Sequence, residues 1–136
     1  MTCSAPIVVF DSGFGGISVL KKLTARCPAE NYLYFGDSRN APYGPRPAEE
    51  VRRLTLDAIG RFVPESPKAV VIACNTATAA ALEDVRQMLP DIPVIGIRPA
   101  LRQAEAAGCR RILSLATAGT LASPSYARQC LALQPE

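Results

Sequence analysis

Short apolar stretches alternate with longer amphipathic ones along the chain, and the alternation occurs five times. The apolar stretches have the length of strands, at 6–10, 31–35, 68–73, 92–97 and 111–116, and the first four are rich in β-branched or aromatic residues. The stretches that follow have the length and composition of helices, at 16–26, 48–63, 76–89, 99–107 and from about 117 to about 133. Strands and helices that alternate at this spacing predict an α/β fold with a parallel, flavodoxin-like sheet.

The composition indicates the class of protein. The chain has 136 residues, of which 49% are hydrophobic and 20% are charged, and these values are typical of one globular domain rather than a disordered chain. Asp11 interrupts the apolar run near the N-terminus, and no stretch approaches the length of a membrane span. We therefore expect a cytoplasmic protein that does not bind a membrane.

The charged residues and the cysteines argue against several kinds of partner. The net charge is +3 and the arginines are scattered, so we expect no nucleic-acid partner. The five cysteines include no Cys-x-x-Cys pair, and the chain has no histidine. This pattern argues against a metal site and against a disulfide framework, and it favours reduced thiols in the cytoplasm.

One cysteine lies where an expected strand gives way to a helix. The stretch "VVIACNTATAAAL" passes from a buried strand into a helix that Asn75 or Thr76 could cap. Cys74 would then lie at the carboxyl end of a parallel strand and face a helix N-terminus. Ligands bind at this edge of α/β sheets, and a helix N-terminus favours the thiolate form of a cysteine. The alternative is that Cys74 is a small buried hydrophobic residue, which is the commoner role of a lone cysteine.

Polar residues follow other expected strands in the same way. The loops after parallel strands share one edge of a sheet, so Asp11-Ser12, Asp37-Ser38, Cys74-Asn75-Thr76 and 117–120 should lie close together. Helix capping explains part of this set, since Ser, Thr, Asp and Asn are the usual capping residues. It does not explain the thiol or the long loop 36–47, and long loops at such an edge are more often functional than structural.

These motifs, in this order, resemble those of the glutamate racemases, which are cofactor-independent enzymes of the aspartate/glutamate racemase family. The matching stretches are "VFDSGFGGISVL" (9–20), "YFGDSRNAPYGPR" (34–46), "VVIACNTATAAAL" (70–82), "IPVIGI" (92–97) and "LATAGTLASPSY" (115–126). The resemblance implies a two-domain α/β enzyme, longer than this chain, that interconverts L- and D-glutamate for peptidoglycan synthesis without a cofactor. It also implies that residues 1–97 form the first domain and residues 98–136 the incomplete beginning of a second. Glutamate is the implied partner, and the chain could form a homo-oligomer.

The resemblance assigns roles to residues of the matching motifs. Cys74 would be one of two catalytic thiols, with Asp11 beside it. Asp11 could accept the proton of Cys74, or as a fixed negative charge it could disfavour the thiolate. The residues that would hold the substrate are Ser12, Tyr43, Gly44, Asn75 and Thr76, with Thr117 and Thr120 at the domain edge of the cleft.

The cysteines other than Cys74 depart from the family pattern. The family's second thiol lies in a Gly-Cys-Thr-His stretch that would come after position 136, and Cys3, Cys27, Cys109 and Cys130 lack that context. We expect Cys109 and Cys130 at helix ends or in the core, and Cys3 in a tail.

The region after the fourth expected strand departs as well. Ala100 stands where the family usually has glycine, which affects the hinge between the domains. The chain thus resembles the N-terminal half of a racemase that holds one wall of the active site. Two alternatives stay open: a catalytically inactive carboxylate-binding module or regulatory relic, and a one-cysteine hydrolase, for which no histidine base exists.

Overall fold

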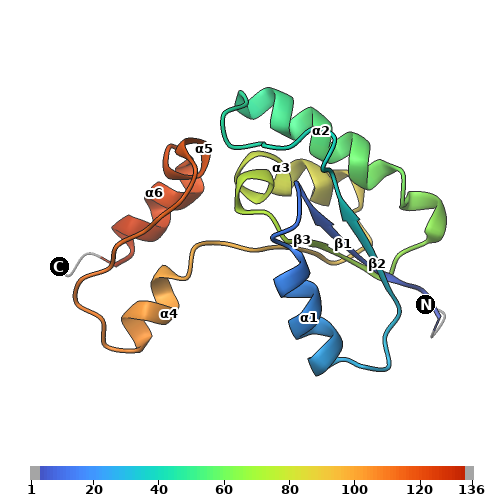
Figure 1. Cartoon of the computed structure of the whole chain (residues 1–136), viewed down its shortest axis with the longest axis horizontal. Coiled ribbons are helices and arrows are strands. Elements are labelled where there is room, and N and C mark those ends of the chain that lie inside the picture. Colours follow the sequence, from blue (N-terminus) through green and yellow to red (C-terminus); the bar gives the residue numbers. More distant parts are fainter. Residues whose placement is uncertain (1–3, 134–136) are drawn as a thin grey trace.

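The structure, a computed structural model, describes residues 4–133. Its centre is a sheet of four parallel strands, β1 (Ile7–Asp11), β2 (Tyr32–Gly36), β3 (Ala69–Ile72) and β4 (Val94–Gly96). The strands lie in the order β2-β1-β3-β4 (Figure 1). This is the flavodoxin-like order over these four strands, so the predicted fold class is confirmed.

Helices cover both faces of the sheet. One face carries α1 (Ile17–Arg26), and the other carries α2 (Ala48–Gly60) and α3 (Asn75–Met88) (Figure 1). Successive side chains of a strand point to opposite faces, so each strand contributes to two apolar layers. The larger layer, under α2 and α3, includes Val8, Phe10, Val51, Ile59, Val70, Ile72 and Val85. The smaller layer, under α1, includes Val9, Val71 and Ala73, packed against Val19, Leu20 and Leu23.

The ends of α2 follow local signals in the sequence. Pro47 immediately precedes the helix, and Glu49 lies in its first turn, where a carboxylate complements the helix dipole. The helix ends at Gly60, three residues earlier than expected, because Pro64 has no N–H to donate to the Gly60 carbonyl. A short 3₁₀ turn at Val63–Glu65 follows.

Beyond β4 the chain forms three short helices, α4 (Leu101–Ala106), α5 (Ala118–Leu121) and α6 (Pro124–Leu131). The strand expected at 111–116 is wrong, because this segment is extended but pairs with no strand of residues 4–133. A strand needs a neighbour for its backbone hydrogen bonds, and an apolar pattern alone does not supply one. Leu113 and Leu115 in this segment are 85% and 88% exposed.

The single helix expected from about 117 to about 133 is also wrong, because two helices occupy this stretch. Pro124 has no N–H with which to continue α5, so a new helix begins there. Ser123 caps the new helix, since its Oγ accepts a hydrogen bond from the N–H of Tyr126 at 3.2 Å.

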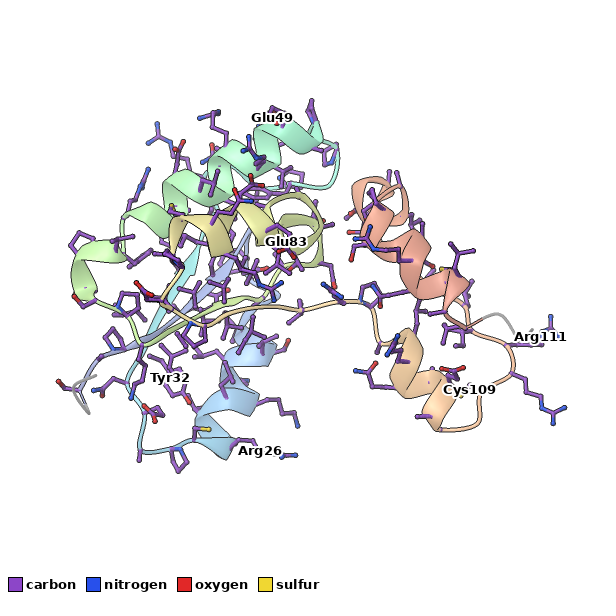
Figure 2. All side chains as sticks on the ribbon, turned by 180° about the vertical axis from the view of Figure 1, so that it is seen from behind. Arg26, Tyr32, Glu49, Glu83, Cys109 and Arg111 are labelled. Carbon is purple, nitrogen blue, oxygen red and sulfur yellow. The ribbon has the colours of Figure 1, made fainter. Side chains whose placement is uncertain are left out.

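Residues 98–133 lie beside the sheet, and α5 and α6 contact α3 (Figure 1). Cys109 and Arg111 lie at the outer end of this region, far from the sheet (Figure 2). The expected division into domains at residue 97 stays a prediction. No helix within residues 4–133 is long and apolar enough to cross a membrane.

Candidate functional site

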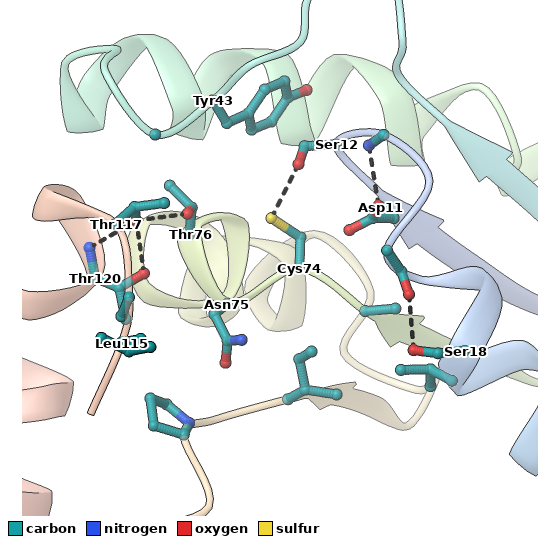
Figure 3. A pocket seen from close by; sticks show the side chains of 18 of the residues that line it. Asp11, Ser12, Ser18, Tyr43, Cys74, Asn75, Thr76, Leu115, Thr117 and Thr120 are labelled. Carbon is teal, nitrogen blue, oxygen red and sulfur yellow. Dashed lines mark hydrogen bonds between the residues drawn. The ribbon is translucent and has the colours of Figure 1, made fainter. Parts of the chain in front are cut away.

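A cleft of about 810 Å³ opens at the carboxyl ends of β1 and β3. These neighbouring strands flank the point where the strand order reverses, which is where open α/β sheets bind ligands. The structure brings to this cleft all nine residues that the sequence assigned to a site, and their individual roles stay predictions (Figure 3). They are Asp11, Ser12, Tyr43, Gly44, Cys74, Asn75, Thr76, Thr117 and Thr120.

Cys74 is the N-cap of α3, a position that we expected Asn75 or Thr76 to occupy. The backbone N–H of Ala77 donates to Cys74 Sγ at 3.4 Å, and Ser12 Oγ lies 3.2 Å from the same sulfur in a second hydrogen bond. The side chain is only 8% exposed, yet it lines the cleft. Cys74 therefore packs on the core, as the alternative interpretation of the sequence expects, and it also lines the cleft. Its catalytic role stays a prediction.

The other described cysteines do not line the cleft. Cys27 and Cys109 are exposed, and Cys130 is half-buried in α6. Cys3 lies outside the described residues. Within residues 4–133, Cys74 is thus the one thiol that a ligand in the cleft could reach.

Asp11 is held in a fixed position at the end of β1. It is buried, and its Oδ2 accepts a hydrogen bond from the backbone N–H of Gly13 at 3.0 Å. Gly16 allows this arrangement, because a Cβ at that position would lie 2.7 Å from Asp11 Cβ. The side chain hydrogen-bonded to the Cys74 sulfur is that of Ser12 and not that of Asp11, a distinction that the sequence motif could not make.

Asp37 joins the loop between β2 and α2 to the sheet through its backbone N–H, which donates to the Asp11 carbonyl at 2.9 Å, and its carboxylate holds the loop together. The Asp37 carboxylate accepts from Tyr43 Oη at 2.8 Å and from Asn40 Nδ2 at 2.9 and 3.0 Å. Burial, reinforced by this hydrogen bond, raises the pKa of Tyr43, so its hydroxyl stays protonated. The Tyr43 hydroxyl therefore donates to Asp37. From the sequence we expected Asp37 at this edge of the sheet, but we did not predict its hydrogen bond to Tyr43.

Three threonine hydroxyls connect the sheet region to the C-terminal helices. Thr76 Oγ1 and Thr117 Oγ1 lie 2.9 Å apart, and Thr117 Oγ1 and Thr120 Oγ1 lie 3.0 Å apart. Thr117 also caps α5 by accepting from the Thr120 N–H. Gly44 packs closely on Thr117, since a Cβ at position 44 would lie 2.8 Å from Thr117 Cγ2. One side of the cleft is therefore built from three segments that meet at Thr117.

The side chains of the cleft suit a small zwitterion. Asp11 is the one charged side chain among the described residues that line it. Its carboxylate could accept hydrogen bonds from an ammonium group, while the hydroxyls and the exposed amide of Asn75 could donate to carboxylates. Phe14, Leu113 and Leu115 add an exposed apolar margin. In residues 4–133, no group of three or more His, Cys, Asp or Glu side chains is arranged to hold a metal ion.

Comparisons with known proteins point to one family. The sequence profile of the Asp/Glu/hydantoin racemases matches residues 7–135. A glutamate racemase of Bifidobacterium longum (strain DJO10A) is 59% identical over 104 residues, which cover 76% of this chain and 39% of that protein.

Solved structures of glutamate racemases share the fold. The enzyme from Thermus thermophilus, in complex with β-chloro-D-alanine, matches with a TM-score of 0.77 and 39% identity, over 95% of this chain and 50% of that one. The enzyme from Francisella tularensis subsp. tularensis SCHU S4, in complex with D-glutamate, matches with a TM-score of 0.80 and 31% identity, over 98% and 50%. The chain spans about half the length of these structures, and less than half of the Bifidobacterium protein.

Proposed function

The chain belongs to the Asp/Glu/hydantoin racemase family, and from that premise we propose that it acts in the interconversion of L- and D-glutamate. The reaction is a cofactor-independent proton transfer at Cα, it takes place in the cytoplasm, and its D-glutamate serves peptidoglycan synthesis. The observation that carries the proposal is the environment of Cys74 Sγ, which is hydrogen-bonded to the backbone N–H of Ala77 and to Ser12 Oγ in a cleft rich in hydroxyl groups. The relatives named glutamate racemase, one of them bound to D-glutamate, support this choice of substrate.

In the proposed reaction Cys74 is the base on one face of the substrate. Its thiolate takes the Cα proton and becomes a thiol, and the electron pair of the C–H bond passes into the adjacent carboxylate. The Cα proton is only weakly acidic, so this charge needs donors that are already in place. Asn75, Thr76, Thr117 and Thr120 supply such donors, together with the N-terminal amides of α3.

The neighbours of Cys74 position the substrate and the sulfur. Ser12 orients the thiol through its hydrogen bond. The ring of Tyr43 and the backbone of Gly44 shape the cleft, because the Tyr43 hydroxyl is occupied by Asp37. Misplacing these groups by about an ångström would cost orders of magnitude in rate.

Asp11 has two alternative roles, and a substitution distinguishes them. If Asp11 accepts the thiol proton, Asp11→Asn lowers the rate at which iodoacetamide alkylates Cys74. If its negative charge disfavours the thiolate, the same substitution raises that rate. Peptide mapping after timed alkylation measures the rate at Cys74, with Cys27 as the internal reference because it is exposed and far from the cleft.

A complete racemisation also needs a proton donor on the face opposite Cys74. None of the other thiols within residues 4–133 lines the cleft. We therefore expect the 136-residue chain to exchange the Cα hydrogen of one glutamate enantiomer without racemising it. A further segment or a second copy of the chain, as in a homo-oligomer, would supply the second group.

The experiment follows the Cα hydrogen in D₂O by proton NMR, with L- and D-glutamate in separate samples. Cys74→Ala should abolish the exchange, while Cys130→Ala should leave it unchanged because Cys130 lies outside the cleft. Exchange that persists in Cys74→Ala would overturn the assignment of the base. Circular dichroism of the recovered glutamate detects racemisation, which would show that the second donor is present.

The second candidate is a carboxylate-binding module without catalysis, and the single thiol of the cleft favours it. Such a module would bind glutamate but would not exchange its Cα hydrogen. Saturation-transfer NMR measures binding independently of exchange, so binding without exchange identifies this alternative.

A further inference from the structure

One edge of the sheet is open, and a hollow lies at its carboxyl end. β2 is the last strand on this side and pairs only with β1 within residues 4–133 (Figure 1). The hollow has a volume of about 550 Å³ and is bounded by the end of β2, the loop that follows it and one side of α2. We propose that this edge binds the C-terminal segment of a partner protein as an added parallel strand, with its terminal carboxylate in the hollow. The proposal does not depend on the chemistry at Cys74.

The backbone of β2 offers hydrogen-bonding groups to such a strand. The residues of an edge strand in a parallel sheet bond alternately toward their neighbour and away from it. The Ile7 N–H donates to Asn31 O at 2.8 Å, just before β2, so the odd-numbered residues of the strand bond to β1. Tyr32 and Tyr34 therefore direct their backbone N–H and C=O groups outward. The hydrogen bonds that these two residues make outside the sheet come from their hydroxyl groups.

The opposite edge of the sheet is protected, in contrast to β2. The Val70 N–H donates to Pro93 O at 2.9 Å, so Val94 at the start of β4 directs its carbonyl outward. The guanidinium group of Arg86 donates to that carbonyl through Nε at 3.3 Å and through Nη2 at 3.2 Å. β2 has the sequence Tyr-Leu-Tyr-Phe-Gly, without the charged residues or proline by which proteins usually protect an exposed edge. The β2 edge is therefore available to another strand.

Two arginines at the hollow have no carboxylate partner. Within residues 4–133, no carboxylate oxygen lies within 4.0 Å of the guanidinium nitrogens of Arg39 or Arg61. The two acidic residues that line the hollow already have partners. Asp57 pairs with Arg53 at 3.2 Å, and the Asp37 carboxylate accepts the hydrogen bonds described above. Arg39 and Arg61 can therefore pair with a carboxylate that comes from another molecule.

The position of these arginines determines the kind of ligand and its direction. They lie at the carboxyl end of β2, so a parallel strand added to the edge would end there and bring its terminal carboxylate to them. Each guanidinium group presents a pair of N–H donors that fits a carboxylate. Phe35, Leu54 and Ala58 line the same hollow and would contact an apolar last side chain. Strand addition at a sheet edge and capture of a C-terminal carboxylate are both established modes of peptide recognition.

Binding of a synthetic peptide to the whole 136-residue chain tests the proposal. The probe is a hexapeptide of alternating threonine and valine that ends in valine with a free carboxylate, and it carries an uncharged fluorophore at its N-terminus. Fluorescence anisotropy at low ionic strength should show saturable binding. The same peptide with a C-terminal amide should bind about tenfold more weakly, since it loses hydrogen bonds between charged groups.

Substitutions separate the hollow from the strand edge. Arg39→Gln and Arg61→Gln should each weaken binding of the free-carboxylate peptide about tenfold and leave binding of the amide peptide unchanged. The matched control is Arg26→Gln, because Arg26 also has no carboxylate within 4.0 Å in residues 4–133 but lies at the end of α1, outside the hollow (Figure 2). This control should leave both affinities unchanged.

The unaltered chain reports the direction of the bound strand, whether or not the variants fold. With a nitroxide in place of the fluorophore, the peptide should broaden the amide NMR signal of Tyr32 more than that of Arg39, because a parallel strand begins at the Tyr32 end. Four results would overturn the proposal: no peptide binding, equal affinity for the amide peptide, an equal loss with Arg26→Gln, and stronger broadening at Arg39, which would indicate an antiparallel strand.

Discussion

The leucines in residues 4–97 and those in residues 98–133, apart from the buried Leu101, have different surroundings. In the first region Leu54, Leu82 and Leu89 are buried under the helices that cover the sheet. In the second region Leu113 and Leu115 are almost fully exposed, although they belong to an apolar stretch of the kind that forms strands. Arginines follow the same division, because those with carboxylate partners all lie in the first region of the described chain.

The difference shows what the four-stranded sheet supplies. Each strand of the first region has a neighbour for its backbone and a helix for its apolar side chains. The second region has short helices that pack on one another and on α3, with no sheet of its own in the described residues. The cleft lies where the two regions meet, with Cys74 on the well-packed side and Thr117 on the other.

A Leu→Ala substitution in each of the two regions should give the largest difference in the free energy of unfolding. Leu82→Ala should lower the free energy of unfolding by about 2–5 kcal/mol, since it leaves a cavity in the larger apolar layer. Leu115→Ala should change it by no more than about 0.5 kcal/mol, because the side chain is exposed. Urea unfolding followed by circular dichroism measures both. A loss above about 1.5 kcal/mol for Leu115→Ala would mean that this leucine is covered in solution.

The sequence predicted the sheet region well and the C-terminal region poorly, for a physical reason. Strands 6–10, 31–35, 68–73 and 92–97 are correct because their apolar runs coincide with actual pairing partners. The run at 111–116 is also mostly apolar, although Ile112 is its one β-branched residue, and pairing depends on a second segment that composition does not reveal.

The sequence predicted which residues line the candidate site, but it did not predict the hydrogen bonds between them. The edge of a parallel sheet collects the loops after its strands, and this rule placed Ser12 and Cys74 in one cleft. Thr117 lies there for a different reason, because the strand expected before it does not form and its Oγ1 lies 2.9 Å from Thr76 Oγ1. The hydrogen bond between Ser12 and Cys74, and that between Asp37 and Tyr43, depend on side-chain rotamers. A sequence motif gives the identity of the residues, but it does not determine which of their atoms form hydrogen bonds.

The contact between the two regions at Gly44 can be disrupted directly. Gly44→Ala would place a methyl group 2.8 Å from Thr117 Cγ2, and overpacking of this kind costs about 1–3 kcal/mol. Either the loop 37–47 or α5 must move, and both line the cleft. Thermal unfolding should show the loss, and alkylation of Cys74 should become faster as the cleft opens.

Two further variants test the cause of that effect. Adding Thr117→Ser to Gly44→Ala removes the clashing methyl group and should restore part of the stability. Gly13→Ala is the control, since a Cβ there meets nothing within 4 Å. Equal losses for Gly44→Ala and Gly13→Ala would show that the cost is not steric.

The exposed leucines should make the chain associate with itself. Leu113 and Leu115 lie close together in sequence and line the margin of the cleft with Phe14, so they offer an apolar surface to a second copy. Sedimentation velocity should show an average mass that rises with concentration. Leu113→Ser with Leu115→Ser should weaken the association by about tenfold or more, because burying one leucine contributes about 1.5–3 kcal/mol. A chain that stays monomeric at every concentration would contradict this expectation.

The ion pair between Arg52 and Asp84 should give the smallest effect, and its pH dependence identifies it. Arg52 Nη2 donates to Asp84 Oδ1 at 2.7 Å across α2 and α3, and this hydrogen bond holds the pKa of Asp84 below its usual value of 3.8. A carboxylate with a lowered pKa stabilises the fold above its unfolded-state pKa, and this contribution is lost as the pH falls through the folded-state value. Arg52→Gln should therefore lower the urea midpoint slightly at pH 7, and the difference from the unaltered chain should shrink below pH 3.8. Both side chains are partly exposed, so salt should also reduce the difference.

Arg61→Gln is the control, because Arg61 has no ion pair within residues 4–133 and its small effect should not vary with pH. A difference for Arg52→Gln that stays constant between pH 7 and pH 3 would mean that the arginine acts through the packing of its methylene groups rather than through its charge.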